Sequence, residues 1–347
     1  MNWKEVSADS TAIFGGAVSG GLDSCTVTHW LSAKEVNVHC YTVDLGQPDE
    51  ENLDAVADRM IACGAKQAHI LDGKEALAKA GLKVIQAQAR YEGGYWNTTG
   101  IARPVTVQSI LNKFSENNVK ILFHGATGRG NDQVRFQLAS NMLDSEIAVY
   151  APWRDQEFLE RFPGRAQMIE YCEKQNLPIK PARESRYSTD ANFLGLTHEA
   201  GDLEDLSVSP DFVTPEMGVW SWDAPDTPDY VTVEWQNGVP IAIDEEKMEL
   251  TDIFTKCNSV AGKHGIGIGT HVIENRFVGI KSRGIYESPG IELLGQSYEY
   301  LLQFILDRRA REFFNNISTL ISTQIYCLLY TSDAADDTPC VDLGGRR

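Results

Sequence analysis

The sequence lacks the features that would place a protein in a membrane or direct it to secretion. No apolar run reaches the roughly 20 residues that a membrane-spanning helix needs. The first residues, Met1 to Glu5, have neither the basic start nor the apolar stretch of a secretory signal. No internal repeat is visible. These absences predict a globular protein of the cytoplasm.

The cysteines and the charges argue against further classes. The seven cysteines are widely spaced and form no C-x-x-C pair, so neither a disulfide scaffold nor a zinc module is expected. Acidic residues outnumber basic ones by 49 to 31, which gives a formal net charge of -18. Without a basic surplus to neutralise phosphates, non-specific binding to nucleic acid is not expected. The 347 residues suffice for about two domains.

The most informative stretch is AIFGGAVSGGLDSC, residues 12–25. A short apolar run leads into the loop 19–24, and a helical pattern with Val27 and Trp30 follows at once. The paired glycines allow a tight turn, and the first N–H groups of the following helix favour an anion. The glycines could equally serve the turn alone. The string as a whole resembles the SGGxDS phosphate loop of ATP pyrophosphatases.

Strand and helix patterns alternate through the first half of the chain, which predicts an α/β fold with a doubly wound parallel sheet. Ligands of such sheets bind at the carboxyl ends of the strands. Three loops are expected there, and we expect them to converge on one crevice: SGGLDS, DLGQPDEE (44–51) and GATGRGND (125–132). Besides the first strand, the strand candidates are 36–43, 68–71, 121–124 and 147–150, and helical patterns cover roughly 74–90 and 104–118.

The character of the sequence changes beyond Pro178 and Pro181, and the rest predicts a second, α+β domain. Asn237-Gly238 lies between two β-rich runs and predicts a hairpin. Helices are expected near 246–261 and 291–314, β-rich runs at 218–222 and 272–280, and a flexible connection at 262–269. The expected domains are 1–175, which would bind the nucleotide, and 176–326, which would bind the co-substrates; the stretch 327–347 is interpreted as a non-native or disordered tail.

Six strings in a fixed order resemble argininosuccinate synthases, a family of the ATP pyrophosphatase superfamily: SGGLDS, YTVDLGQPDEE, GGYWNTTGIARP, GATGRGNDQVRF, ESRYSTDANFLGLTHEAGDLED and HVIENRFVGIKSRGIYESPG. The resemblance covers about residues 12–326. It implies a cytoplasmic ligase that joins citrulline and aspartate. Citrulline would attack ATP, accompanied by Mg²⁺, to give citrullyl-AMP and pyrophosphate, and aspartate would displace AMP. It also implies a homotetramer.

The resemblance assigns the ATP site to positions on the three loops and in the second half. The phosphate loop is expected to stabilise the charge that accumulates on the leaving pyrophosphate. Cys25 stands where the family usually has a hydroxyl residue, and a thiol is a weaker donor. The ATP-binding positions implied are Ala17, Val18, Ser19, Gly20, Gly21, Leu22, Asp23, Ser24, Cys25, Val43, Gly125, Thr127, Asp132 and Asp190. Which carboxylate binds Mg²⁺ stays open.

The two amino-acid substrates are assigned by the same resemblance. The aspartate positions are Thr127, Asn131 and Asp132, and the citrulline positions are Tyr95, Asn131, Arg135, Ser188, Thr197, Glu199, Glu274 and Tyr286. Arg135 is the natural partner of a carboxylate, and the residues expected to act in catalysis are Asp23, Ser24, Asp132 and Arg135. Simpler interpretations stay open, because Asn131-Asp132 could cap a helix and the glutamates could be solvated surface charge.

Two other functions compete with the ligase. One is another ATP pyrophosphatase, such as a tRNA-modifying or amidotransferase relative, against which the net acidity and the missing C-x-x-C pair weigh. The other is a catalytically impaired nucleotide-binding fragment. No residue stands out as a general base, so positioning and charge stabilisation are expected to supply most of the rate.

Overall fold

The computed structural model describes residues 3–6, 12–48, 52–126, 131–179, 186–275 and 279–327. The chain divides into two compact units. The first comprises Met1–Asp44, Glu50–Gly73 and Arg103–Glu184, and the second comprises Leu45–Asp49, Lys74–Ala102 and Ser185–Arg347. Each unit is assembled from separate stretches of sequence. The domain boundary expected at residue 175 stays a prediction, and the expected tail lies, apart from Cys327, outside the described residues.

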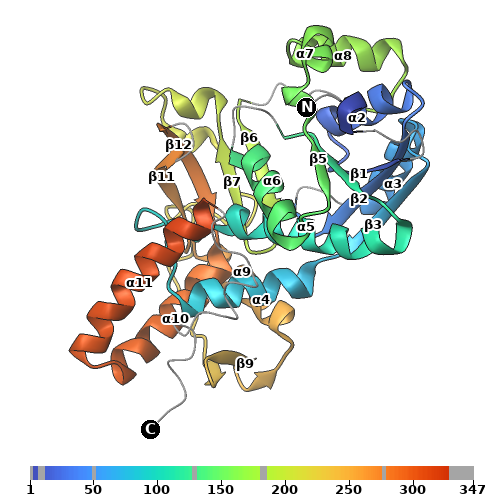
Figure 1. Cartoon of the computed structure of the whole chain (residues 1–347). Helices are drawn as coiled ribbons and strands as arrows, with labels where there is room; N and C mark the ends of the chain where they lie inside the picture. The colour runs from blue at the N-terminus through green and yellow to red at the C-terminus, as the bar shows by residue number, and fades with distance from the viewer. Residues whose placement is uncertain are drawn as a thin grey trace. The chain divides into compact units, whose positions relative to one another are not determined.

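The first unit is built on a five-stranded parallel sheet in the order β3-β2-β1-β4-β5 (Figure 1). The expected α/β class with a parallel sheet is confirmed. The strands are β1 (Ile13–Ala17), β2 (Asn37–Asp44), β3 (Gln67–Asp72), β4 (Ile121–His124) and β5 (Ala148–Tyr150). The helices are α1 (Trp3–Val6), α2 (Leu22–Ser32), α3 (Leu53–Ala62), α6 (Asn131–Leu143), α7 (Gln156–Arg161), α8 (Arg165–Lys174) and a 3₁₀ turn at Pro152–Arg154.

The central strand β1 is covered by side chains that its neighbours supply. Gly15 and Gly16 carry none themselves, and a Cβ built at Gly16 would lie 2.2 Å from the Phe123 ring of β4. A Cβ at Gly15 would lie 2.2 Å from the ring of Phe114. Phe14, between them and the start of the strand, is fully buried in the apolar core of this unit. Aromatic rings from other elements therefore fill the space that side chains at the two glycines would occupy.

Helix α5 (Thr98–Asn117) begins six residues earlier than the expected start at residue 104. Pro104, at which the expected helical pattern started, lies inside the helix. The division between the two units falls within α5, between Ala102 and Arg103. The first turn of α5, residues 98–102, thus belongs to the second unit, and Arg103 and the rest of the helix belong to the first.

The described residues of the second unit form two antiparallel sheets and four further helices. One sheet has the order β11-β12-β7-β6 and the other β10-β9-β8. The strands are β6 (Ser188–Asn192), β7 (Gly195–Glu199), β8 (Val233–Gln236), β9 (Val239–Ile243), β10 (Glu246–Lys247), β11 (Ile268–Asn275) and β12 (Ile280–Glu287). The helices are α4 (Lys74–Gln86), α9 (Leu250–Lys263), α10 (Pro289–Ile305) and α11 (Arg308–Tyr326), with 3₁₀ turns at Gly201–Glu204 and Pro210–Phe212.

The turn between β8 and β9 confirms the expected hairpin. Asn237 and Gly238 have φ angles of 52° and 75°, the left-handed pair that a two-residue turn between antiparallel strands requires. Other expectations for this unit were wrong. Residues 218–222 form no strand, and β11 begins at Ile268 within the stretch expected to be a flexible connection. The single helix expected at 291–314 is two helices, because Asp307 caps a new one by accepting from the N–H groups of Arg309 and Ala310.

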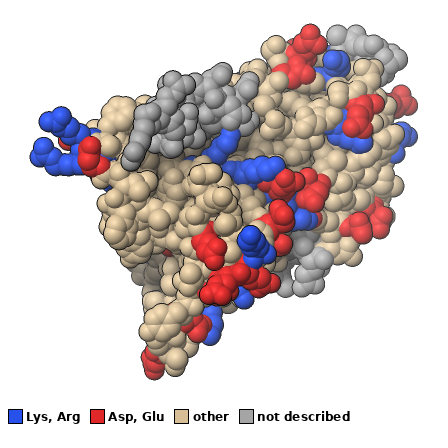
Figure 2. All heavy atoms as spheres, turned by 90° about the horizontal axis from the view of Figure 1, so that it is seen from below, with Lys and Arg blue, Asp and Glu red and all other residues tan. Residues whose placement is uncertain are grey.

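None of the helices among the described residues is long and apolar enough to cross a membrane. Charged side chains of both signs are mixed on the face drawn in Figure 2, where Lys and Arg lie among Asp and Glu.

Candidate active site

The first candidate site element is the loop that joins β1 to α2. Gly20 adopts a left-handed conformation with φ of 73°, which glycine tolerates without a steric cost. The Ser24 hydroxyl accepts from the backbone N–H of Ser19 at 3.1 Å, so the two serines expected to meet phosphate are held together. Arg59 of α3 donates from Nη1 to the Gly20 carbonyl at 2.8 Å. The sequence signalled the serines and glycines but not Arg59, which lies 39 residues away.

The loop leads directly into the amino terminus of α2. Gly21, the residue before the helix, is extended and makes no side-chain cap. The exposed N–H groups of the first turn and the helix dipole are therefore placed as an anion site requires. Leu22 begins the helix. The local sequence accounts for this geometry, since two glycines turn the chain and a helix-forming stretch follows at once.

Asp23, in the first turn of α2, is held by a residue that the sequence did not indicate. Trp153 donates from Nε1 to Asp23 Oδ1 at 3.2 Å. Burial raises the pKa of Asp23, and the hydrogen bond from Trp153 and the charge of Arg165 oppose that rise only in part. A carboxyl group whose charged form is disfavoured repels a neighbouring phosphate less than an ordinary aspartate does.

Cys25 is buried in the core of the first unit, where its thiol lies 3.7 Å from the Gly20 carbonyl oxygen. A hydrogen bond from Cys63 lowers the pKa of Cys25, although burial opposes the shift. The thiol thus contacts the backbone beneath the loop. This placement accords with the expected weak contribution of Cys25 to phosphate binding, which stays a prediction.

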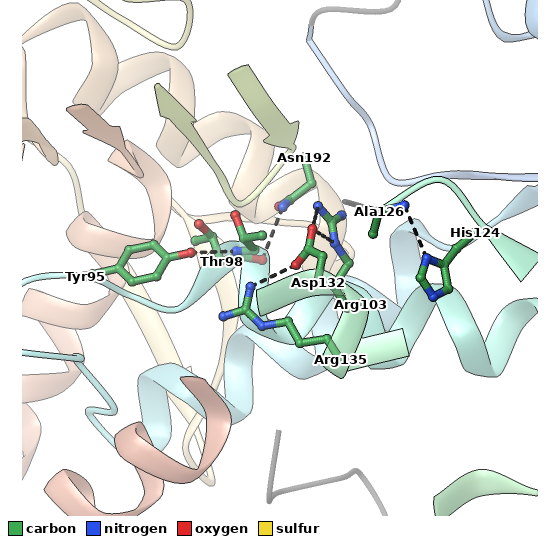
Figure 3. Close-up of polar contacts among 9 residues, drawn as sticks. Tyr95, Thr98, Arg103, His124, Ala126, Asp132, Arg135 and Asn192 are labelled. Carbon is green, nitrogen blue, oxygen red and sulfur yellow. Dashed lines mark hydrogen bonds and ion pairs between the residues drawn. The ribbon is translucent and has the colours of Figure 1, made fainter. Parts of the chain in front are cut away.

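The end of β4 lies against the phosphate loop. A Cβ built at Gly125 would lie 3.1 Å from the Cβ of Asp23, so the two segments are in close contact there. His124 precedes it, fully buried, and its Nδ1 accepts from the backbone N–H of Ala126 at 3.2 Å (Figure 3). Burial lowers the pKa of His124 to about 4, so the ring is neutral near neutral pH. Thr127 and the rest of the loop to residue 130 lie outside the described residues.

The loop after β2 is the third that was expected at the crevice. Val43 is buried next to the end of β2. Leu45–Asp49 belong to the second unit, where the Leu45 carbonyl accepts from the N–H of Phe193 at 2.9 Å. The convergence of all three loops stays a prediction, whereas the first loop and the end of β4 do meet.

Helix α6 begins at Asn131 and carries Asp132 and Arg135, and Arg103 of α5 lies beside these two side chains (Figure 3). Arg103 donates from Nε to Asp132 Oδ2 at 2.9 Å, and its Nη2 forms an ion pair with the same oxygen at 2.8 Å. Arg135 donates to Asp132 Oδ1 from Nη1 at 3.0 Å. Burial would raise the pKa of Asp132, but the two guanidinium groups outweigh it and hold the pKa well below its usual range. Asp132 is therefore a permanent anion and a very weak base.

The second unit collects the remaining candidates on one antiparallel sheet. Thr197 of β7 lies directly across from Asp190 of β6 on one side and from Tyr286 of β12 on the other. Ser188 and Glu199 are cross-strand partners two residues further along the same two strands. Directly opposed residues place their side chains on the same face of a sheet. The buried hydroxyl of Thr197 has no hydrogen-bond partner among the residues that the structure describes.

Tyr95 packs against this sheet, with its ring centroid 4.7 Å from that of Tyr286. Its hydroxyl accepts from the N–H of Thr99 at 2.9 Å. Asn192, which the sequence did not single out, donates to the Thr98 carbonyl at 3.2 Å and so ties β6 to the start of α5 (Figure 3). The short stretch after Tyr95 is thereby fixed to the sheet that carries Asp190 and Thr197.

Glu274 lies on β11, and the Tyr91–Tyr95 turn holds its backbone. The Tyr91 hydroxyl donates to the Glu274 carbonyl at 3.0 Å, and the Glu274 N–H donates to Glu92 Oε2 at 3.3 Å. The ring of Tyr91 stacks on Tyr326 at a centroid distance of 3.9 Å. The candidate residues thus form two groups, one in each unit, and their meeting in a single site stays a prediction.

The donor set for Mg²⁺ is sparse. Within the described ranges, no group of three or more His, Cys, Asp or Glu side chains is placed to hold a metal ion. Both Asp132 oxygens are engaged by arginine, so that carboxylate does not suit a cation. Mg²⁺ commonly binds through one or two carboxylates together with substrate phosphates and water. Asp23 is the carboxylate of the phosphate loop, and its Oδ1 accepts from Trp153 Nε1.

Comparison with known proteins gives consistent results for the whole chain. The family model described as the arginosuccinate synthase N-terminal HUP domain matches residues 15–178. The model of the arginosuccinate synthase C-terminal domain matches residues 187–340. An argininosuccinate synthase of Rhodopirellula baltica is 40% identical over 312 residues, which cover 89% of this chain and 77% of the relative. The chain therefore belongs to the argininosuccinate synthase family.

Proposed function

We propose that the protein joins L-citrulline to L-aspartate at the expense of ATP, with AMP and pyrophosphate as the other products. The observation that carries the proposal is the anion site at the start of α2, in a chain of this family: a left-handed Gly20, the paired serines and an uncapped helix terminus. Such a site suits the pyrophosphate that leaves when the α-phosphorus is attacked.

In the first step, the ureido oxygen of citrulline forms a bond to the α-phosphorus while the bond to the bridging oxygen breaks. The electron pair leaves with pyrophosphate, whose charge the loop 19–24 and the first turn of α2 stabilise. Arg135 binds the citrulline carboxylate by its guanidinium group. Tyr95, Ser188, Thr197 and Tyr286 orient the rest of the molecule, and Glu199 and Glu274 take its α-ammonium group.

In the second step, the amine of aspartate attacks the activated ureido carbon, and AMP leaves with the former ureido oxygen. Asn131, Asp132 and Thr127 hold the aspartate. Asp132 is too weak a base to remove the amine proton, because two arginines stabilise its anionic form. Both Asp132 oxygens are held by arginine, so Asp132 acts through Arg103 and Arg135, and the rate comes from orientation and charge stabilisation.

The proposal includes a homotetrameric assembly and a location in the cytoplasm, both of which the resemblance implies. Mg²⁺ enters with ATP as its complex and supplies charge neutralisation on the phosphates. The match to both synthase domain models and to a synthase at 40% identity supports an active ligase over an impaired nucleotide-binding fragment.

The test follows the oxygen atom. Citrulline labelled with ¹⁸O in the ureido group is incubated with ATP, Mg²⁺ and aspartate, and the AMP is examined by mass spectrometry. We expect AMP that carries one ¹⁸O, formed only when citrulline and aspartate are both present. Unlabelled AMP, or AMP formed without citrulline, would contradict the ligase. Binding of ATP with no turnover would favour the impaired fragment.

A further inference from the structure

The ion pair of Arg103 with Asp132 is asymmetric in a way that bears on Arg135. The hydrogen bond from Arg103 Nε, at 2.9 Å, and the ion pair of its Nη2, at 2.8 Å, both involve the same oxygen, Oδ2. The other oxygen, Oδ1, accepts from a single nitrogen of Arg135 at 3.0 Å. Figure 3 shows the carboxylate between the two guanidinium groups. Asp132 is thus shared by two arginines from two different helices.

This sharing prevents a competing arrangement. A carboxylate and a guanidinium group prefer to pair through two parallel hydrogen bonds, which use both oxygens and two nitrogens. Asp132 lies three residues before Arg135 on α6, so their side chains are neighbours on the helix surface. Without Arg103, both oxygens of Asp132 would be able to turn onto Arg135. The edge of the guanidinium group that a substrate carboxylate needs would then be covered.

The charge balance of the three residues points the same way. Asp132 with Arg135 alone is neutral overall, whereas the three side chains together carry a net positive charge of one. A site that attracts a carboxylate needs such a surplus, and the side chains of Arg103 and Arg135 are 19% and 5% exposed, so solvent screens them little. Arg103 therefore supplies the charge that remains after Asp132 is compensated.

We propose that Arg103 is a positioning residue: by holding Asp132 Oδ2, it keeps Asp132 from pairing with Arg135 through both oxygens and leaves Arg135 able to bind the substrate carboxylate. The inference rests on the proposed function, in which Arg135 binds citrulline. It assigns Arg103 no contact with substrate, and its action passes through Asp132.

The test compares three single variants. Arg103→Met removes the charge and the donors but keeps much of the apolar length. Arg103→Lys restores the charge but has a single nitrogen in place of the two that contact Asp132. Lys113→Met is the control, because Lys113 lies on the same helix and donates to the exposed Glu116. We expect Arg103→Met to raise the KM for citrulline by about 10-fold or more, with the KM for ATP changed by less than about 2-fold. Arg103→Lys should recover part of the loss, and Lys113→Met should behave as wild type.

Asp132→Asn identifies the route of the effect. If Arg103 acts through Asp132, adding Arg103→Met to Asp132→Asn should change the KM for citrulline by less than about 2-fold, far below the product of the single effects. Full multiplication of the two effects would overturn the proposal. An unchanged KM in Arg103→Met, or an equal rise in the KM for ATP, would overturn it as well.

A crystal structure of Arg103→Met separates this inference from the proposed function. We expect both Asp132 oxygens to face Arg135 in that variant, whatever the activity of the protein. An Asp132 that keeps one oxygen away from Arg135 would refute the positioning role. A wild-type protein that makes no AMP from citrulline and aspartate would refute the ligase and leave the structural result standing on its own.

Discussion

Replacement of Gly20 by alanine tests whether the phosphate loop depends on its left-handed glycine. Gly20 has a φ of 73°, and a Cβ built there would lie 2.5 Å from Arg59 Nη1 and 2.8 Å from Val56 Cγ1. Arg59 is the residue that donates to the Gly20 carbonyl. The alanine methyl group would therefore meet the side chain that holds the loop in place.

The expected loss has two parts. An alanine in the left-handed region costs about 1–2 kcal/mol. Displacement of Arg59 removes a hydrogen bond from a charged donor, which is worth about 1.5–3 kcal/mol. Together they predict a loss of about 3–5 kcal/mol from a folding free energy of about 5–15 kcal/mol. Gly279→Ala isolates the first part, since Gly279 has a φ of 69° and no atom within 4 Å of its built Cβ.

Urea unfolding and calorimetric titration with pyrophosphate measure the two effects. We expect Gly20→Ala to lose at least about twice as much stability as Gly279→Ala, and to bind pyrophosphate at least about 10-fold more weakly, while Gly279→Ala binds as wild type. Equal stability losses in the two variants, or unchanged pyrophosphate binding in Gly20→Ala, would refute the role given to Gly20 and Arg59.

Three further predictions concern other parts of the molecule. Arg135→Ala should raise the KM for citrulline by a factor corresponding to about 2–3 kcal/mol while leaving that for ATP nearly unchanged; an unaltered citrulline dependence would remove Arg135 from the site. Glu287, fully buried, accepts from His198 Nε2 at 2.7 Å and from two backbone N–H groups. Glu287→Leu should cost about 3–5 kcal/mol in urea unfolding, and a loss below about 1 kcal/mol would contradict this. The pKa of His124 falls from 6.5 to about 4 on folding, so the unfolded chain binds the proton more readily between these values. Stability should therefore fall by up to about 3 kcal/mol as the pH drops through that window, and His124→Asn should flatten the dependence between about pH 7 and about pH 5; equal slopes in the two proteins would argue against it.

The parts of the fold that follow from neighbouring residues could be predicted. The joint between β1 and α2 lies within 14 residues of sequence. Its glycines, serines and helix start are close in sequence, so a local pattern is enough to predict it. The Asn237-Gly238 hairpin is equally local, because the turn type is set by the two residues themselves. The fold class followed from the alternation of such local elements.

Contacts between distant residues could not be predicted in this way. Arg59 and Gly20 are 39 residues apart, and Trp153 and Asp23 are 130 apart. No motif marks Arg59 or Trp153, because their role arises only when α3 and the segment after β5 pack beside the loop. The helix start at Thr98 was missed for a related reason: Pro104 weakens the local helical signal, and packing overrides it.

The two glycines at the centre of β1 constrain aromatic residues that lie about 100 positions later in the sequence. The rings of Phe114 and Phe123 occupy the room that side chains at Gly15 and Gly16 would take. An enlarged residue at either position is tolerated only if the facing ring shrinks in the same step. In homologues, a larger residue at position 15 or 16 should therefore occur together with a smaller residue in place of the facing phenylalanine. The total side-chain volume packed against β1 would then stay the same.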